Sequence, residues 1–197
     1  MAATHRASAS PRDEARGIAA GPARAALHQA LATLLGARDR AQPTEMVLAL
    51  SQVARCYRAL DALAQAERYL DQALRWSVLI GAADAEVRLL CELIDACYDL
   101  AVAAQGDDPA ASRAALERMR DHAFAAAARA GHVSDPSWEV TVLLRVSDAL
   151  RRCGDHDDAL NLHARAMKLM QRGDATPTAR QADGSLPRTA PQWPCTD

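Results

Sequence analysis

One pattern occurs twice in this chain, and the two copies align without a gap. The first copy is residues 50–76, LSQVARCYRALDALAQAERYLDQALRW, and the second is residues 143–169, LLRVSDALRRCGDHDDALNLHARAMKL. Both copies place large apolar residues first and two alanines, seven residues apart, later: Leu50, Val53, Tyr57, Ala66 and Ala73 match Leu143, Val146, Leu150, Ala159 and Ala166. An internal repeat of this length is typical of a fold in which similar units are stacked on one another.

The residue types in the chain favour helices over strands. Among 197 residues there are 46 alanines, but only 12 valines and isoleucines together and one phenylalanine. Alanine is the strongest helix former, whereas β-branched and aromatic residues favour strands. The sequence therefore predicts an all-α fold.

Apolar residues recur at helical spacing between turn residues, which predicts about seven helices. The predicted ranges are about 22–37, 45–60, 62–80, 83–104, 109–131, 136–153 and 155–172. Short turns such as Gly154-Asp155 join them, so neighbouring helices are expected to be antiparallel. The two tails, residues 1–21 and 173–197, lack this periodicity, and the second is rich in proline. Both tails are therefore predicted to be disordered.

The two matched segments resemble the tetratricopeptide repeat family. That family has a large apolar residue, a second apolar residue four before an aromatic one, and then two alanines seven residues apart. The segment YLDQALRWSVLIGAADAEVRLLCELIDACYDL, residues 69–100, resembles the longer variants found in bacterial regulatory proteins. The resemblance implies a solenoid of antiparallel hairpins over residues 22–172, with repeats at about 43–80, 84–131 and 136–172. The alanines fit it, because two helices approach closely only where one side chain is short.

The resemblance also implies a binding surface. In tetratricopeptide arrays the first helix of each pair lines a concave groove, which receives a peptide or a helix. On this sequence the groove residues are Gln52, Arg55, Arg58, Glu92, Asp99, Arg145, Asp148, Arg151 and Arg152. This groove has mixed charge with an arginine-rich end, which suits an acidic segment. The alternative is that these charges lie on solvated helix faces and bind nothing.

Two functions follow from the resemblance. The first is a non-enzymatic adaptor that binds a peptide or helix of another protein in the groove. The second is a regulatory or sensor module of a bacterial signalling system, of the type associated with diguanylate cyclases or transcription regulators, acting in trans. A solenoid also has two open ends that must be capped or paired. Leu162, Met167 and Met170 are available for a homodimer through the last helix.

No residue pattern predicts an enzyme. The chain has no Gly-rich phosphate loop, no HExxH sequence and no nucleophile elbow. The five cysteines form neither a CxxC motif nor a Cys/His cluster, so no disulfide framework, metal site or cofactor is predicted. His163 is expected on the packed side of the last helix, as a satisfied core or edge histidine.

Charge and hydropathy exclude other classes of partner. With 23 basic and 25 acidic residues the formal charge is -2, which predicts neither nucleic-acid binding nor polybasic attachment to a membrane. No stretch approaches the roughly 20 apolar residues that a membrane span needs. The N-terminus has no apolar region of the kind found in signal peptides. The sequence therefore predicts a cytoplasmic protein.

Overall fold

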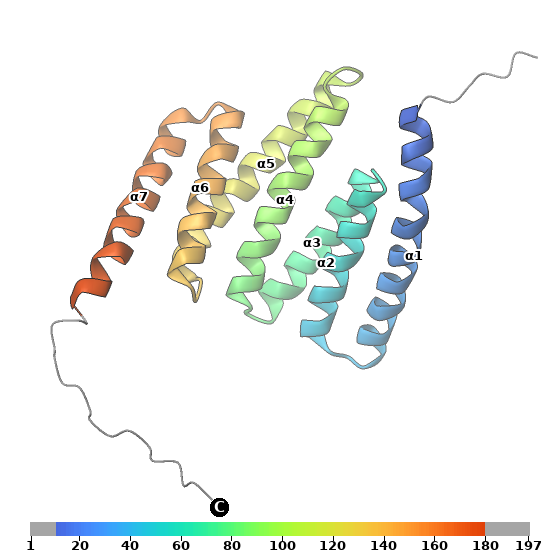
Figure 1. The fold of residues 1–197 in the computed structure, drawn as a ribbon, viewed down its shortest axis with the longest axis horizontal. Helices are drawn as coiled ribbons and strands as arrows, with labels where there is room; N and C mark the ends of the chain where they lie inside the picture. The colour runs from blue at the N-terminus through green and yellow to red at the C-terminus, as the bar shows by residue number, and fades with distance from the viewer. Residues whose placement is uncertain (1–10, 180–197) are drawn as a thin grey trace, which may run out of the picture.

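The computed structural model describes the backbone of residues 11–179 and the side chains of residues 21–172 (Figure 1). This part of the chain forms seven α-helices and one short 3-10 turn: α1 (Pro11–Asp39), α2 (Pro43–Ala59), α3 (Leu63–Leu79), α4 (Ala83–Ala104), α5 (Pro109–Arg129), η1 (Ala130–His132), α6 (Pro136–Cys153) and α7 (His156–Ala179). The prediction of an all-α fold with about seven helices is confirmed. No helix in the described part is both long and apolar enough to cross a membrane.

Each helix packs mainly against the helices before and after it in the sequence. The pairs α2/α3, α4/α5 and α6/α7 are antiparallel hairpins, and α1 packs on α2. In Figure 1, α2, α4 and α6 lie next to one another, while α3 and α5 lie behind them. The hairpins are therefore stacked in sequence order, as the internal repeat predicts.

The turns carry residues that suit the ends of helices. Gly154 has φ +92°, a left-handed conformation that favours glycine. Its amide donates to the carbonyl of Arg151, and the amide of Asp155 donates to that of Leu150, which closes α6. At the helix starts, the Asp108 side chain accepts hydrogen bonds from two amides of α5, and the Asp135 side chain accepts one from α6. These caps satisfy amides that have no partner within the helix.

Alanine lies where the two helices of a hairpin meet. Ala66 in α3 and Ala159 in α7 are almost completely buried at matching positions of the repeat. The Ser147 hydroxyl of α6 donates to the carbonyl oxygen of Ala159 over 2.8 Å, so the two backbones are close at this point. A short side chain permits this approach, because a larger one would hold the helices apart.

Large apolar side chains fill the space between the hairpins. One cluster joins α4, α5, α6 and α7 and includes the fully buried Met119, Leu143 and Leu150. A second joins α2, α3 and α4 and includes Leu70 and Leu93. Because α4 contributes to both clusters, it connects the first hairpin to the last.

The first helix is longer than its predicted range of 22–37. It begins at Pro11, and so it includes residues 11–21, which the sequence analysis assigns to the N-terminal tail. Pro22 lies inside α1, where it removes one backbone hydrogen bond without ending the helix. The segment before it lacks an apolar period, but alanine, glutamate and arginine are strong helix formers that need no buried face.

The last helix is also longer than predicted. It runs to Ala179 instead of ending near Arg172, and it continues through Gly173. Glycine lowers helix propensity by only about 1 kcal/mol relative to alanine, so it does not have to end a helix. The remaining parts of the predicted disordered tails, residues 1–10 and 180–197, lie outside the described residues.

Candidate functional site

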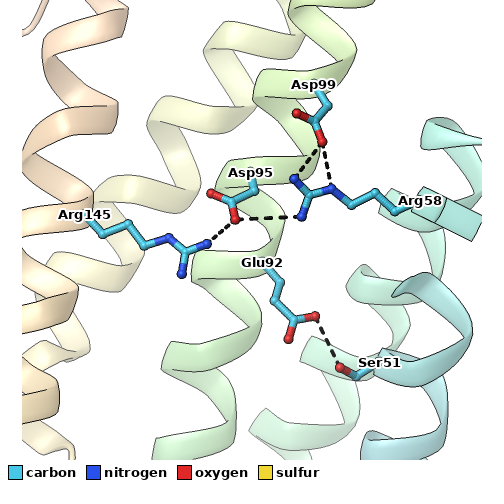
Figure 2. A network of polar contacts seen from close by, with 6 residues as sticks. All are labelled: Ser51, Arg58, Glu92, Asp95, Asp99 and Arg145. Atoms are coloured by element: carbon cyan, nitrogen blue, oxygen red, sulfur yellow. Dashed lines mark hydrogen bonds and ion pairs between the residues drawn. The ribbon is translucent and has the colours of Figure 1, made fainter. Parts of the chain in front are cut away.

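Polar side chains from three hairpins meet on the surface formed by the first helix of each hairpin. We call this surface the first-helix face. It is defined by Ser51, Arg55 and Arg58 on α2, Glu92, Asp95 and Asp99 on α4, and Arg145, Asp148 and Arg152 on α6. Figure 2 shows six of these residues, which form a network of contacts across α2, α4 and α6.

The centre of this network is Asp95 on α4. The Arg58 guanidinium donates to the Asp99 carboxylate over 2.7 Å and lies 3.8 Å from that of Asp95. From the other side, Arg145 pairs with the same Asp95 carboxylate (Figure 2). These side chains are about one-third exposed, so each pair contributes only about 0.2–1 kcal/mol. The network therefore fixes which charges meet between the three hairpins, but it adds little to the stability of the fold.

A second part of the first-helix face involves Ser51. Its hydroxyl donates to the Glu92 carboxylate over 3.2 Å (Figure 2), and the Arg55 guanidinium lies 3.4 Å from the same hydroxyl oxygen. Gln52 and Arg55 are exposed. This end of the face is therefore more open to solvent than the centre.

The arginines of α6 pair within their own helix. The Asp148 carboxylate accepts hydrogen bonds from Arg151 over 2.5 Å and from Arg152 over 2.8 Å. The Arg151 hydrogen bond is the main cause that holds the pKa of Asp148 below its usual value. Arg152 also stands over the ring of Tyr98, with its guanidinium carbon 4.4 Å from the ring centre, in a cation–π contact.

The structure thus places most of the predicted groove residues close together, but already in charge pairs. Sequence reasoning missed Asp95 and Tyr98, which hold Arg145 and Arg152 respectively. A signal for Asp95 was present: it lies three residues after Glu92 and four before Asp99, which puts all three on one side of a helix. The arginine-rich end is consequently balanced by carboxylates of the same chain.

A pocket lies on the open side of the last hairpin, between α6 and α7. Its volume is about 540 Å³, and it is lined by Leu144, Ser147, Asp148, Arg151, His156, Ala159, Leu160 and His163. Leu160 is 68% exposed, and Met167 and Met170 further along α7 are 41% and 44% exposed. We call this surface the end face and define it by Leu144, Leu160, His163, Met167 and Met170.

The prediction that His163 lies on the packed side of α7 is wrong. His163 is exposed and lines the pocket, whereas Ala159 and Ala166 are buried against α6. Leu162 also differs from its prediction, because it packs against the core instead of being available at the open end. Neighbouring residues of a helix point in directions about 100° apart, so a small error in the assumed buried face exchanges such positions.

The buried cysteines do not have the properties of nucleophiles. Burial raises the pKa of the Cys91 thiol to about 11, and it also raises the pKa of Cys97. A thiol with a raised pKa stays protonated at neutral pH, and the thiolate is the reactive form. Within residues covered by the structure, no group of three His, Cys, Asp or Glu side chains could hold a metal ion.

Ionisable groups also gather between α3 and α5. Arg118 donates to the Glu67 carboxylate over 2.6 Å, and the Cys97 thiol donates to the same oxygen over 3.3 Å. His122 lies in this group near Asp71. Burial lowers the pKa of His122, and this effect outweighs the nearby carboxylates, which act in the opposite direction. The folded protein therefore disfavours the charged form of this histidine.

We expect this histidine to make folding depend on pH. The pKa of His122 is lower in the folded protein than its ordinary value of 6.5, so the unfolded chain binds a proton that the folded protein does not. The free energy of unfolding should therefore fall as the pH drops from about 7.5 to about 5.5, and His122→Gln should reduce this fall. Urea denaturation at both pH values measures it. Replacing the exposed His132 by glutamine is the control, and an equal effect of both substitutions would contradict the assignment.

Comparisons with known proteins do not assign the chain to a family. No protein-family model matches it, and no curated protein matches it in sequence. One solved structure, described as "DHF58 filament", is 22% identical, covers 85% of this chain and 86% of its own, and has a TM-score of 0.47. Another, BtubC (BKLC) from P. vanneervenii, is 12% identical. The match covers 93% of this chain and 99% of that chain, with a TM-score of 0.26. Both scores and identities are low, so neither similarity supports an argument about function.

Proposed function

We propose that this protein is a non-enzymatic binding module of tetratricopeptide-like hairpins, which holds a helix of a protein on its end face. The observation that carries the proposal is the pocket between α6 and α7. Its volume of about 540 Å³ lies within the range typical of ligand sites. Leu144, Ala159 and Leu160 supply apolar lining, and Ser147, Asp148, Arg151 and the two histidines add polar groups. A groove of this kind suits the apolar side of an amphipathic helix.

The end face is a better binding surface than the first-helix face. On the first-helix face, Arg58, Arg145 and Arg152 already pair with carboxylates of the same chain. An acidic peptide would have to replace these pairs, so its net gain would be small. The pocket between α4 and α6 is also small, with a volume of about 70 Å³. These two facts favour the end face as the main site.

Two further observations support a tetratricopeptide-like module without catalytic activity. Alanines seven residues apart are buried in both α3 and α7, at positions that match in the repeat. The buried thiols of Cys91 and Cys97 have raised pKa values, which disfavours nucleophilic chemistry. Both observations agree with a protein whose role is to bind another protein.

Photo-crosslinking with the full-length protein tests this function. A photoreactive amino acid such as p-benzoylphenylalanine is introduced at Leu160 on the end face, and separately at Leu48, which is 58% exposed on α2. In a native lysate we expect a discrete protein adduct from position 160 and none from position 48. The added substitution Met167→Asp should remove the adduct, because it places a charge on the apolar face. No adduct from position 160, or equal adducts from both positions, would contradict the proposal.

A further inference from the structure

One side of α7 carries a regular stripe of three apolar and two histidine side chains, which the described part of the chain leaves open. Its members follow one another at spacings of four and three residues, which keeps them on one side of a helix: His156, Leu160, His163, Met167 and Met170. The side of α7 that faces α6 is already covered, because Ala159, Leu162 and Ala166 pack into the hairpin. The helix therefore has a covered apolar side and a second, partly apolar side that nothing in the described part of the chain covers.

The first hairpin shows what covers the matching side of a helix. In the repeat, Leu70 of α3 matches His163; Ser77 and Met170 hold the same place one residue beyond the two copies. Leu70 is only 3% exposed and Ser77 is fully buried, because α4 packs along α3. In the last hairpin the matching residues remain open, and Met170 is 44% exposed. The same side of the second helix is thus covered by the next helix in the first hairpin and left open in the last hairpin.

The charges on α7 indicate which helix fits. Asp157 in its first turn and Lys168 near its middle are both exposed and lie eleven residues apart, which is about three turns, so they are on the same side of the helix. If a second α7 packs antiparallel to the first, Asp157 of each copy comes near Lys168 of the other. In a parallel pair, Asp157 of one copy and Lys168 of the other would instead lie about 16 Å apart along the helices and could not pair. The two helix dipoles are also favourably arranged when the helices are antiparallel.

We propose that the end face is occupied by a second copy of this chain. The two α7 helices pack antiparallel about a two-fold axis that passes beside His163, near the middle of the stripe. Leu160 of each copy then lies near Met167 of the other. This inference rests on the proposed function of the end face as a binding surface for a helix, and it names the partner. Since the stripe is one helix wide, the contact is expected to be small, with a dissociation constant of roughly micromolar order.

Sedimentation velocity of the full-length protein over a range of concentrations tests the dimer. We expect the unchanged protein to dimerise and Leu160→Asp to raise the dissociation constant by at least about 100-fold, because a buried unpaired charge in an apolar contact is strongly unfavourable. The matched control is Leu79→Asp, since Leu79 is 75% exposed on α3, outside the end face. Circular dichroism checks that both variants keep their helices. A dimer that Leu160→Asp leaves intact would overturn the proposal.

Charge exchange and crosslinking test the antiparallel arrangement. Asp157→Lys should weaken the dimer, and adding Lys168→Asp should restore it. In a Cys195→Ser background, His163→Cys should form a disulfide-linked dimer on mild oxidation, because His163 lies on the stripe beside the two-fold axis. Gln171→Cys should not, because its two copies are about 22 Å apart along antiparallel helices but adjacent along parallel ones. Crosslinking through Gln171→Cys would overturn the arrangement.

These outcomes separate the dimer from the proposed function. An adduct from position 160 with twice the mass of the chain supports the second copy as partner. If the protein stays monomeric while position 160 gives an adduct with a different protein, the second copy is ruled out but the end face remains a binding surface. If neither a dimer nor an adduct forms, both proposals are wrong.

Discussion

Replacing Leu150 by alanine is expected to lower the free energy of unfolding by about 2–5 kcal/mol, which is a large part of the stability of a typical domain. Leu150 is fully buried on α6, in the cluster that joins α4, α5, α6 and α7. The substitution removes apolar contacts and leaves a cavity that the surrounding helices can close only in part. Equilibrium unfolding in urea, followed by circular dichroism, measures the change.

The matched control for Leu150 is the same substitution at an exposed leucine. Leu79 on α3 is 75% exposed, so Leu79→Ala is expected to change the free energy of unfolding by no more than about 0.5 kcal/mol. If the two variants were equally stable, Leu150 could not belong to the core between the last two hairpins.

A larger side chain at Ala66 is expected to have the second-largest effect. Ala66→Leu should lower the free energy of unfolding by about 1–3 kcal/mol, because the added atoms have no space between α2 and α3. Ala66 is fully buried, and Ala159 occupies the matching position between α6 and α7. Ala159→Leu should cost less, because Ala159 also lines the pocket of the end face, which can take part of the larger side chain. Urea denaturation of both variants gives the two values.

An exposed alanine of the same helix separates overpacking from helix propensity. Ala64 lies on the open side of α3. Since alanine and leucine have similar helix propensities, Ala64→Leu should leave stability nearly unchanged. If Ala66→Leu were equally harmless, the hairpin would not depend on a short side chain at this position, and the physical reason given for the repeated alanines would fail.

The first-helix face and the end face differ in how much binding free energy a partner can gain from them. On the first-helix face, Asp95 and Asp148 already neutralise arginines of the same chain. A ligand there gains only the difference between its own contacts and those it replaces. On the end face, Leu160 and Met167 are in contact with water, and covering them removes apolar area from it at a gain of about 25 cal/mol per Å². This difference is the physical reason for placing the proposed binding site on α7.

Most of the fold could be predicted from the sequence. Helix positions depend on local propensity and on the spacing of apolar residues, both of which are properties of short segments. The buried alanines at 66 and 159 were predictable for the same reason, because the repeat marks them as equivalent. The start of α1 and the end of α7 were missed, because the helix continues there beyond the apolar pattern and no buried face marks those residues.

The candidate site was predicted less well, because it depends on contacts between helices. The positions of Arg58 and Arg145 on first helices followed from the repeat, but their common partner Asp95 did not. His163 was assigned to the wrong side of α7, since a difference of one residue changes its direction by about 100°. The sequence by itself determined the helices, their order and the small side chains where the two helices of a hairpin meet, because these depend on neighbours in the chain. Only the tertiary structure decided which charges pair and which apolar side stays open, because both depend on distances between helices far apart in the sequence.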